Sequence, residues 1–387
     1  MTQENREQYP QQILQKDVQI WSILSLIFGD EGISELSSCF SKCSFLQNVK
    51  LLLSNNKLSV KGLLSLAQKL SYGTSLITMK LCIVDVTVTD EIALALGTAL
   101  QSCANLQDFS LTIDVTNQIA SALGLAISNC KKLKNFKLIV SQISSISVYG
   151  IKNFVSKLSR CSSLSSLSIK FKSNIIINES PFEKSQVGFT NFTNLKSLSL
   201  VAKDTEIIKE DLSSLISDIH LCPTLETLQL KFNYTNLESD EGANTIATTL
   251  AKCTNLKALE IKLNQQFMKY NQIGPKDLQN FSQSLSKCSQ LSSLNINLNE
   301  NNIQDEGAQA IVSVLPNLVN LYDLYVSLKS CGISSVGISC LNPSLARCSK
   351  LSSLAFELYY NIDMDLLVKN RTKYLKLKRL VFLSKFL

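Results

Sequence analysis

The chain repeats one stretch of sequence, seen most clearly as Cys253-Thr-Asn-Leu256-Lys-Ala-Leu259-Glu-Ile261-Lys-Leu263. Close copies begin at Cys103 and Cys288, and the cysteine position returns at intervals of about 30 residues. Eight copies keep the cysteine and four replace it, at Cys43, Gly73, Cys103, Cys130, Cys161, Phe192, Cys222, Cys253, Cys288, Leu318, Cys348 and Tyr374. A near-constant period of this length predicts a solenoid of about twelve stacked repeats rather than a globular domain.

The residues before each cysteine have the spacing of a helix. Apolar side chains stand at offsets 0, 3, 7 and 10, as in Leu278, Phe281, Leu285 and Cys288. These offsets place all four side chains on one helix face, so the cysteine is a packing position at the helix end. Acidic pairs open several of these segments, at Asp30-Glu31, Asp240-Glu241 and Asp305-Glu306. We expect their carboxylates to cap free backbone N–H groups where each helix begins, at the positive end of its dipole.

After the cysteine the apolar period changes to two. Leu259-Glu-Ile261-Lys-Leu263 alternates apolar and polar side chains, which is typical of a half-buried strand. One strand followed by one helix in each repeat predicts an α/β solenoid with a parallel β-sheet on one side and helices on the other. Strands stack about 4.8 Å apart whereas helices need about 10 Å. We therefore expect a horseshoe with the sheet on its concave face and the helices on its convex face.

The leucine ladders, the asparagine-rich turns at Asn55-Asn56 and Asn301-Asn302, and the Asp-Glu-Gly helix starts resemble the ribonuclease-inhibitor-like class of leucine-rich repeat proteins. The resemblance covers nearly the whole chain, from about residue 20 to residue 387. It implies a protein-binding scaffold, but it does not identify the partner. We expect a polar segment over residues 1–18, followed by a single solenoid domain over residues 19–387.

The sequence restricts where the protein is found in the cell and what its cysteines do. No apolar run approaches the length of about 20 residues that crosses a bilayer, and residues 1–16 lack the plan of a signal peptide. We expect a cytoplasmic or otherwise intracellular protein, with cytoskeletal, ciliary and nuclear assemblies left open. The cysteines outside the repeating position show no zinc spacing, which favours buried reduced thiols over disulfides or metal ligands. Cys82 is the exception, because the strand alternation turns it outward.

Catalytic chemistry is hard to assemble from these residues. His220 is the one histidine, and its place near a helix end beside Cys222 favours a surface position over acid–base catalysis. No phosphate-binding glycine motif occurs. We therefore expect a non-catalytic protein without catalytic residues, metal or cofactor. The resemblance leaves one regulatory alternative, a GTPase activator that organises the site of the GTPase itself.

The net charge of +7 is concentrated at the end of the chain. Residues 371–387 carry six basic and no acidic side chains, which leaves +1 for the remainder. A nearly neutral body argues against nucleic-acid binding, which needs a broad basic footprint. The tail fits a last strand, with Leu380 and Phe382 on the ladder and lysines that discourage edge pairing. Docking of this basic and apolar edge on an acidic partner, on another subunit or on an anionic membrane surface stays open.

Candidate binding residues lie at the outward positions of the strands. Six are lysines with little acid nearby until Glu260 and Glu357, at Lys50, Lys80, Lys137, Lys170, Lys231 and Lys262. They favour a partner with an acidic surface, although solvated strand faces often carry lysine. A second candidate is the loop of the longest repeat, where Phe267, Met268 and Tyr270 could anchor an interface. The sequence thus predicts a protein-interaction scaffold, with a structural subunit of a larger assembly as the alternative.

Overall fold

The computed structural model describes residues 20–24, 29–38, 45–54, 56, 58–84, 86, 88–141, 144, 146–172, 188–203, 209–233, 240–264, 273–339, 341–361 and 382–384. The predicted polar segment, residues 1–18, lies outside these ranges. The chain forms two compact units, Met1–Leu195 and Lys196–Leu387, which are called the first and the second unit below. A single domain over residues 19–387 stays a prediction.

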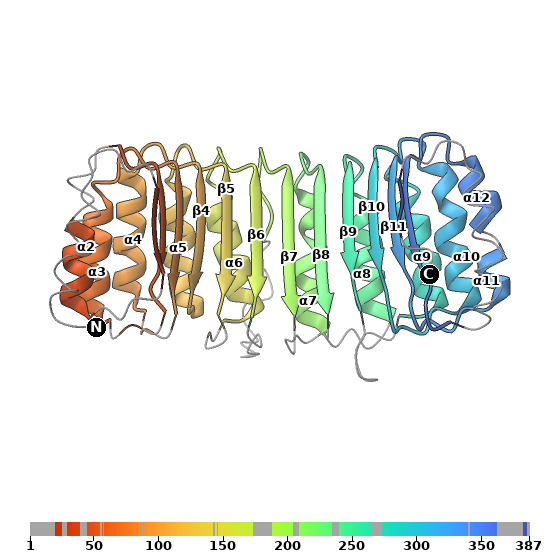
Figure 1. Ribbon diagram of the computed structural model, residues 1–387, viewed down its shortest axis with the longest axis horizontal. Coiled ribbons are helices and arrows are strands. Elements are labelled where there is room, and N and C mark those ends of the chain that lie inside the picture. Colours follow the sequence, from red (N-terminus) through yellow and green to blue (C-terminus); the bar gives the residue numbers. More distant parts are fainter. Residues whose placement is uncertain are drawn as a thin grey trace. The chain divides into compact units, whose positions relative to one another are not determined.

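The first unit alternates strands with helices. Its strands are β1 (Ile20–Leu24), β2 (Asn48–Leu52), β3 (Thr78–Ile83), β4 (Asp108–Ile113), β5 (Asn135–Val140) and β6 (Ser166–Phe171). Its helices are α2 (Asp30–Ser38), α3 (Val60–Leu70), α4 (Asp90–Ser102), α5 (Asn117–Ser128) and α6 (Val148–Leu158). Neighbouring strands from β1 to β6 pair in parallel, and the helices lie on one side of these strands (Figure 1).

The second unit has the same plan. Its strands are β7 (Ser197–Lys203), β8 (Thr227–Asn233), β9 (Ala258–Lys262), β10 (Ser293–Asn297), β11 (Asp323–Ser327), β12 (Ser353–Glu357) and β13 (Phe382–Ser384). Its helices are α7 (Lys209–Ser217), α8 (Asp240–Leu250), α9 (Pro275–Leu285), α10 (Gln304–Val314), α11 (Ser335–Ser339) and α12 (Leu341–Arg347), with short 3₁₀ turns at Ile219–Leu221 and Leu315–Asn317. Its neighbouring strands are also parallel, and its helices cover one side of them (Figure 1).

Strand alternation decides which side chains enter the core. In β2 and just after it, Val49, Leu51 and Leu53 are buried, whereas Lys50 and Leu52 are half-buried on the opposite face. The buried side chains pack between the sheet and the apolar faces of helices such as α3. The predicted α/β repeat architecture, with a parallel sheet on one face and helices on the other, is confirmed within each unit. The face without helices is called the strand face below.

The repeating cysteine packs at the end of its helix against the preceding repeat. Cys103, Cys130, Cys161, Cys222, Cys253, Cys288 and Cys348 are buried, and no disulfide joins the described cysteines. The Cys103 thiol donates to the Leu70 carbonyl of the preceding repeat at 3.4 Å, and Cys161 donates to the Cys130 carbonyl at 3.5 Å. Burial raises the pKa of the Cys103 thiol to about 12. The predicted packing role is therefore confirmed at these seven positions, while Cys39, Cys43 and Cys340 lie outside the described residues.

Adjacent repeats are also joined where their helices begin. Asp30, the first residue of α2, accepts hydrogen bonds from the Ser59 hydroxyl and from the Ser59 N–H, the latter at 2.7 Å. Ser59 is the N-cap of α3, and a Cβ at Gly62 would displace the Asp30 carboxylate, so glycine at that position lets the clamp form. The same clamp is formed by Asn117, Ser147 and Gly150 and by Asp305, Ser334 and Gly337. The carboxylates of Asp30 and Asp305 thus bind the N-cap residue of the following repeat, which corrects the expectation that they cap their own helices.

Asparagines satisfy the backbone of the turns after two strands in the second unit. Asn301 Nδ2 donates to the carbonyls of Leu263 at 2.9 Å and Leu298 at 2.8 Å. Asn361 Nδ2 binds the carbonyls of Leu328 and Leu358 in the same way, at 2.7 and 2.9 Å. Each side chain therefore links its own turn to that of the preceding repeat, which supplies partners for backbone groups that a buried turn would otherwise leave unsatisfied.

The register of the last strand differs from the sequence prediction. The ladder placed Leu380 opposite Leu354, but Leu383 occupies that position in β13. The interval from Leu354 to Leu383 nearly equals the interval from Leu324 to Leu354 in the preceding pair, whereas Leu380 would have made it shorter. Pairing at Leu383 keeps the spacing between successive strands close to that of the preceding repeat. A terminal strand is confirmed, but its predicted register was wrong.

Candidate functional site

The strand face of the first unit carries a row of lysines. Register aligns Lys50 with Lys80, Lys80 with Ser110, and Ser110 with Lys137 across β2 to β5. Lys80 and Lys137 are exposed and Lys50 is half-buried. These three lysines, with Ser110 between them, are called the lysine row. Adjacent parallel strands lie about 4.8 Å apart, so side chains that are distant in sequence form one short basic strip.

The lysine row forms no ion pair within the part of the chain that the structure describes. Within the described residues, no carboxylate forms an ion pair with Lys50, Lys80 or Lys137. Asp108 lies on the same face at the start of β4, but its carboxylate accepts a hydrogen bond from Asn135 Nδ2 at 2.5 Å. The row therefore keeps its positive charge at the surface, where an incoming carboxylate would meet it.

A partly apolar row runs beside the lysine row. Two residues further along each strand, register aligns Leu52, Cys82, Thr112 and Ile139, and these four are called the apolar row. Leu52, Cys82 and Ile139 are half-buried and Thr112 is buried. The Cys82 sulfur lies 3.2 Å from the Ser54 hydroxyl, so the predicted outward direction of Cys82 is confirmed. Lys170 extends this second row, opposite Ile139, and does not belong to the lysine row.

The lysines of the second unit have a different environment. Lys231 and Lys262 are opposite one another on β8 and β9. The Glu260 carboxylate lies 2.8 Å from both ammonium groups, one on each oxygen. Partial burial alone would raise the pKa of Glu260, but the hydrogen bonds and charges of Lys231 and Lys262 lower it below its usual value. The three side chains form a closed ion-pair cluster, which leaves these lysines less able to bind an external acid.

Sequence reasoning missed a second polar cluster on the same unit. Glu357 is buried, and its Oε2 lies 2.7 Å from Lys329 Nζ and 3.1 Å from the Ser327 hydroxyl. Lys329 Nζ also lies 5.0 Å from the centre of the Tyr359 ring. Burial acts to raise the pKa of Glu357, but hydrogen bonds from Lys329, Tyr325 and Ser327 lower it overall. Lys329 and Tyr359 continue the outward alternation one step beyond their strands, and extending the strand pattern by one pair would have found them.

The structure thus separates the predicted binding residues into three groups. Lys50, Lys80 and Lys137 come together, Lys170 lies one row away, and the remaining two lysines are ion-paired with Glu260. Phe267, Met268 and Tyr270 lie outside the described residues. Their role in binding stays a prediction.

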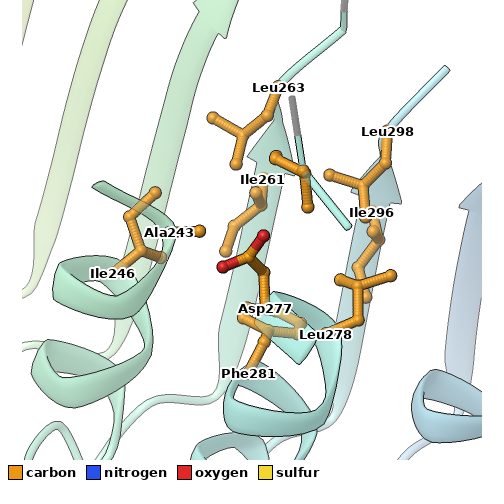
Figure 2. Close-up of a pocket in the computed structure, with 10 residues that line it drawn as sticks. Ala243, Ile246, Ile261, Leu263, Asp277, Leu278, Phe281, Ile296 and Leu298 are labelled. Atoms are coloured by element: carbon orange, nitrogen blue, oxygen red, sulfur yellow. The ribbon is translucent and has the colours of Figure 1, made fainter. Parts of the chain in front are cut away.

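Cavities in the second unit offer little to a small molecule. An internal cavity of about 20 Å³ between α8, α9, β9 and β10 is lined mainly by apolar side chains, with Asp277 among them (Figure 2). That volume holds roughly one water molecule. A wider groove of about 520 Å³ runs between α9 and α10, and its walls carry amides, hydroxyls and the carboxylate of Glu306. No hydrogen bond joins a serine hydroxyl among these lining residues to Glu306, as a nucleophile paired with its base would require.

Other described side chains show no catalytic or metal-binding cluster. His220 lies in the 3₁₀ turn after α7, where its Nδ1 is 2.6 Å from the Ser217 carbonyl, so the predicted helix-end position is confirmed. Within the described ranges, no three residues among His, Cys, Asp and Glu come together as a set of metal ligands. In the same part of the chain, every helix is too short or too polar to span a bilayer.

Comparison with known proteins gives one family match and several similar structures. A family model for the leucine-rich repeat matches residues 290–312, which include β10 and most of α10. Among solved structures, a leucine-rich repeat protein of Leptospira interrogans is similar at 15% identity, with 98% of each chain covered and a TM-score of 0.39. Internalin C2 of Listeria monocytogenes is similar at 20% identity over 68% of this chain and 83% of its own, with a TM-score of 0.36. No curated protein sequence gives a significant match.

Proposed function

We propose that this protein is a non-catalytic scaffold of the ribonuclease-inhibitor-like class of leucine-rich repeats, which binds a protein partner through its strand face. The observation that carries the proposal is the lysine row, three aligned basic side chains without an ion-pair partner among the described residues. Charges held in this way attract a complementary surface and speed its association. The partner is therefore a protein with an acidic patch, and the first unit is the main contact.

Affinity capture with charge-reversed protein tests this function. The full chain is immobilised as wild type, as the triple variant Lys50→Glu, Lys80→Glu and Lys137→Glu, and as a control with Lys131→Glu, Lys134→Glu and Arg160→Glu. The control has the same change in net charge, but its three exposed residues lie in turns or at a helix end. We expect proteins from a cell extract to be retained by wild type and control and lost from the triple variant. Equal retention by all three proteins would remove the lysine row from the binding surface.

The same capture separates the alternative roles. A structural subunit would be retained in a fixed ratio to a few partners, and it would depend on the C-terminal residues 371–387 rather than on the lysine row. A GTPase activator would accelerate nucleotide hydrolysis by a captured GTPase. The loop residues Phe267, Met268 and Tyr270 are tested by a triple alanine variant, which would lose the partner only if aromatic anchors from this loop enter the interface.

A further inference from the structure

We propose that the strand face of the first unit binds an acidic amphipathic helix that lies across strands β2 to β5. This inference rests on the proposed function and specifies the shape of the partner segment. It follows from two adjacent rows on the same surface, the lysine row and the apolar row. One row supplies positive charge and the other supplies apolar area, in strips that run perpendicular to the strands.

The spacing of the lysines matches a helix. Lys50 and Lys80 are on neighbouring strands, about 4.8 Å apart, while Lys80 and Lys137 are two strands apart, about 9.6 Å. An α-helix rises about 1.5 Å per residue, so carboxylates at i, i+3 and i+10 lie on one edge at intervals of about 4.5 and 10.5 Å. An extended segment presents side chains on one side only at intervals of about 6.8 Å, which fits neither lysine spacing.

The apolar row would contact the apolar edge of the bound helix. It runs about 6.6 Å from the lysine row, because it lies two residues further along each strand. A helix with its side chains is about 10 Å wide and covers both rows at once. Leu52 and Ile139 are half-buried, so each still has apolar surface to lose on contact, which is favourable in proportion to the area removed from water.

Backbone hydrogen bonding also favours a helix over an extended peptide. The apolar row offers few polar groups to a bound main chain, and buried N–H and C=O groups without partners are costly. A helix satisfies these groups internally. The opposite border of the lysine row is formed by Asn48, Thr78, Asp108 and Asn135, a polar edge suited to the solvated side of the helix.

Fluorescence anisotropy with synthetic peptides tests the inference on the full-length chain. The probe is a helical peptide of about eighteen residues with Glu at i, i+3 and i+10 and Leu at i+4, i+8 and i+11. One control peptide has the same composition with the Glu residues spread around the helix, and another carries a central Pro that breaks the helix. We expect the patterned peptide to bind at least about tenfold more tightly than either control. Reversal of Lys50, Lys80 and Lys137 to Glu should weaken that binding by at least about tenfold, whereas the Lys131, Lys134 and Arg160 reversal should leave it within about twofold.

The outcomes distinguish this inference from the broader function. Equal binding of all three peptides, with loss on reversal of the lysine row, would overturn the helix and leave an acidic partner of another shape. If no peptide binds but a natural partner is captured through the lysine row, the helical partner is ruled out and the broader function stands. If neither the peptides nor the captured proteins respond to the reversal, both proposals fail. Circular dichroism and urea unfolding of the triple variant confirm that a lost signal is not a folding defect.

Discussion

The lysine row on the strand face of the first unit has no ion-pair partner among the described residues, whereas two lysines on the strand face of the second unit are bound by a carboxylate of the same chain. Lys80 and Lys137 represent the first case, and Lys231 and Lys262, both held by Glu260, represent the second. Lys137 lies seven residues after its repeating cysteine and Lys262 lies nine after it, so Glu260, not Lys262, occupies the repeat position of the lysine row. Whether a lysine is ion-paired depends on which residue lies beside it on its own strand and on the next strand.

The largest effect is expected from the buried carboxylate of the second unit. Glu357→Ala would leave Lys329 without its carboxylate partner, while the Ser327 hydroxyl keeps Asn299 as an acceptor, and we expect the unit to lose about 1–3 kcal/mol of stability. Lys50→Ala in the first unit is the matched control, and it should change stability by less than about 0.5 kcal/mol because no described partner is lost. Urea unfolding measures both, with native-state hydrogen exchange to assign the change to β11 and β12. Equal effects would mean that the two strand faces do not differ as the contacts indicate.

A substitution at Glu260 should make the strand face of the second unit more like that of the first, with lysines that form no ion pair. Glu260→Gln removes the negative charge that pairs with Lys231 and Lys262, and a partly exposed cluster of this kind contributes about 1 kcal/mol. The variant should also bind an acidic peptide more tightly. Adding Lys231→Gln and Lys262→Gln should abolish this gain in affinity. Anisotropy titration at low and high salt checks the electrostatic origin, since screening should reduce the gain. If affinity for the acidic peptide does not rise, ion pairing is not what distinguishes the two faces.

Acidification should produce the smallest of the three effects and should act mainly on the second strand face. The pKa values of Glu260 and Glu357 are lower in the folded chain than their usual value. Their stabilisation is therefore complete above the unfolded-state pKa of about 4.3, and it is lost as pH falls through the lower folded-state values. Hydrogen-exchange protection, corrected for intrinsic rates, should fall at β9 and β12 before it falls at β3 and β5. Simultaneous loss in all four strands would contradict the assignment.

The clamps at the helix starts provide an internal comparison for the same titration. Hydrogen bonds from Ser59 hold the pKa of Asp30 below its usual value. Burial acts to raise the pKa of Asp305, but the hydrogen bonds from Ser334 lower it overall. Asn117 occupies the equivalent position at α5 and does not titrate. In acid we therefore expect α3 and α11 to lose protection at their first turns while α6 keeps it.

The sequence by itself determined the repeat unit and the direction of its side chains. The regular return of the cysteine, the offsets of the helix and the alternation of the strand predicted parallel strands, the covering helices and the buried cysteines. They also identified Lys50, Lys80 and Lys137 as outward residues. These features depend on local periodicity, which fixes the face to which each side chain turns before any repeat meets another.

Only the tertiary structure decided which side chains meet. Glu260 bridges Lys231 and Lys262, Asp30 binds Ser59, and Leu383 takes the place predicted for Leu380. Contacts between repeats depend on register, and register depends on the exact length of each helix and turn between strands. A change of one residue turns a strand side chain to the opposite face. Sequence periodicity averages over those lengths, so it places residues on a surface without showing which of them are already paired there.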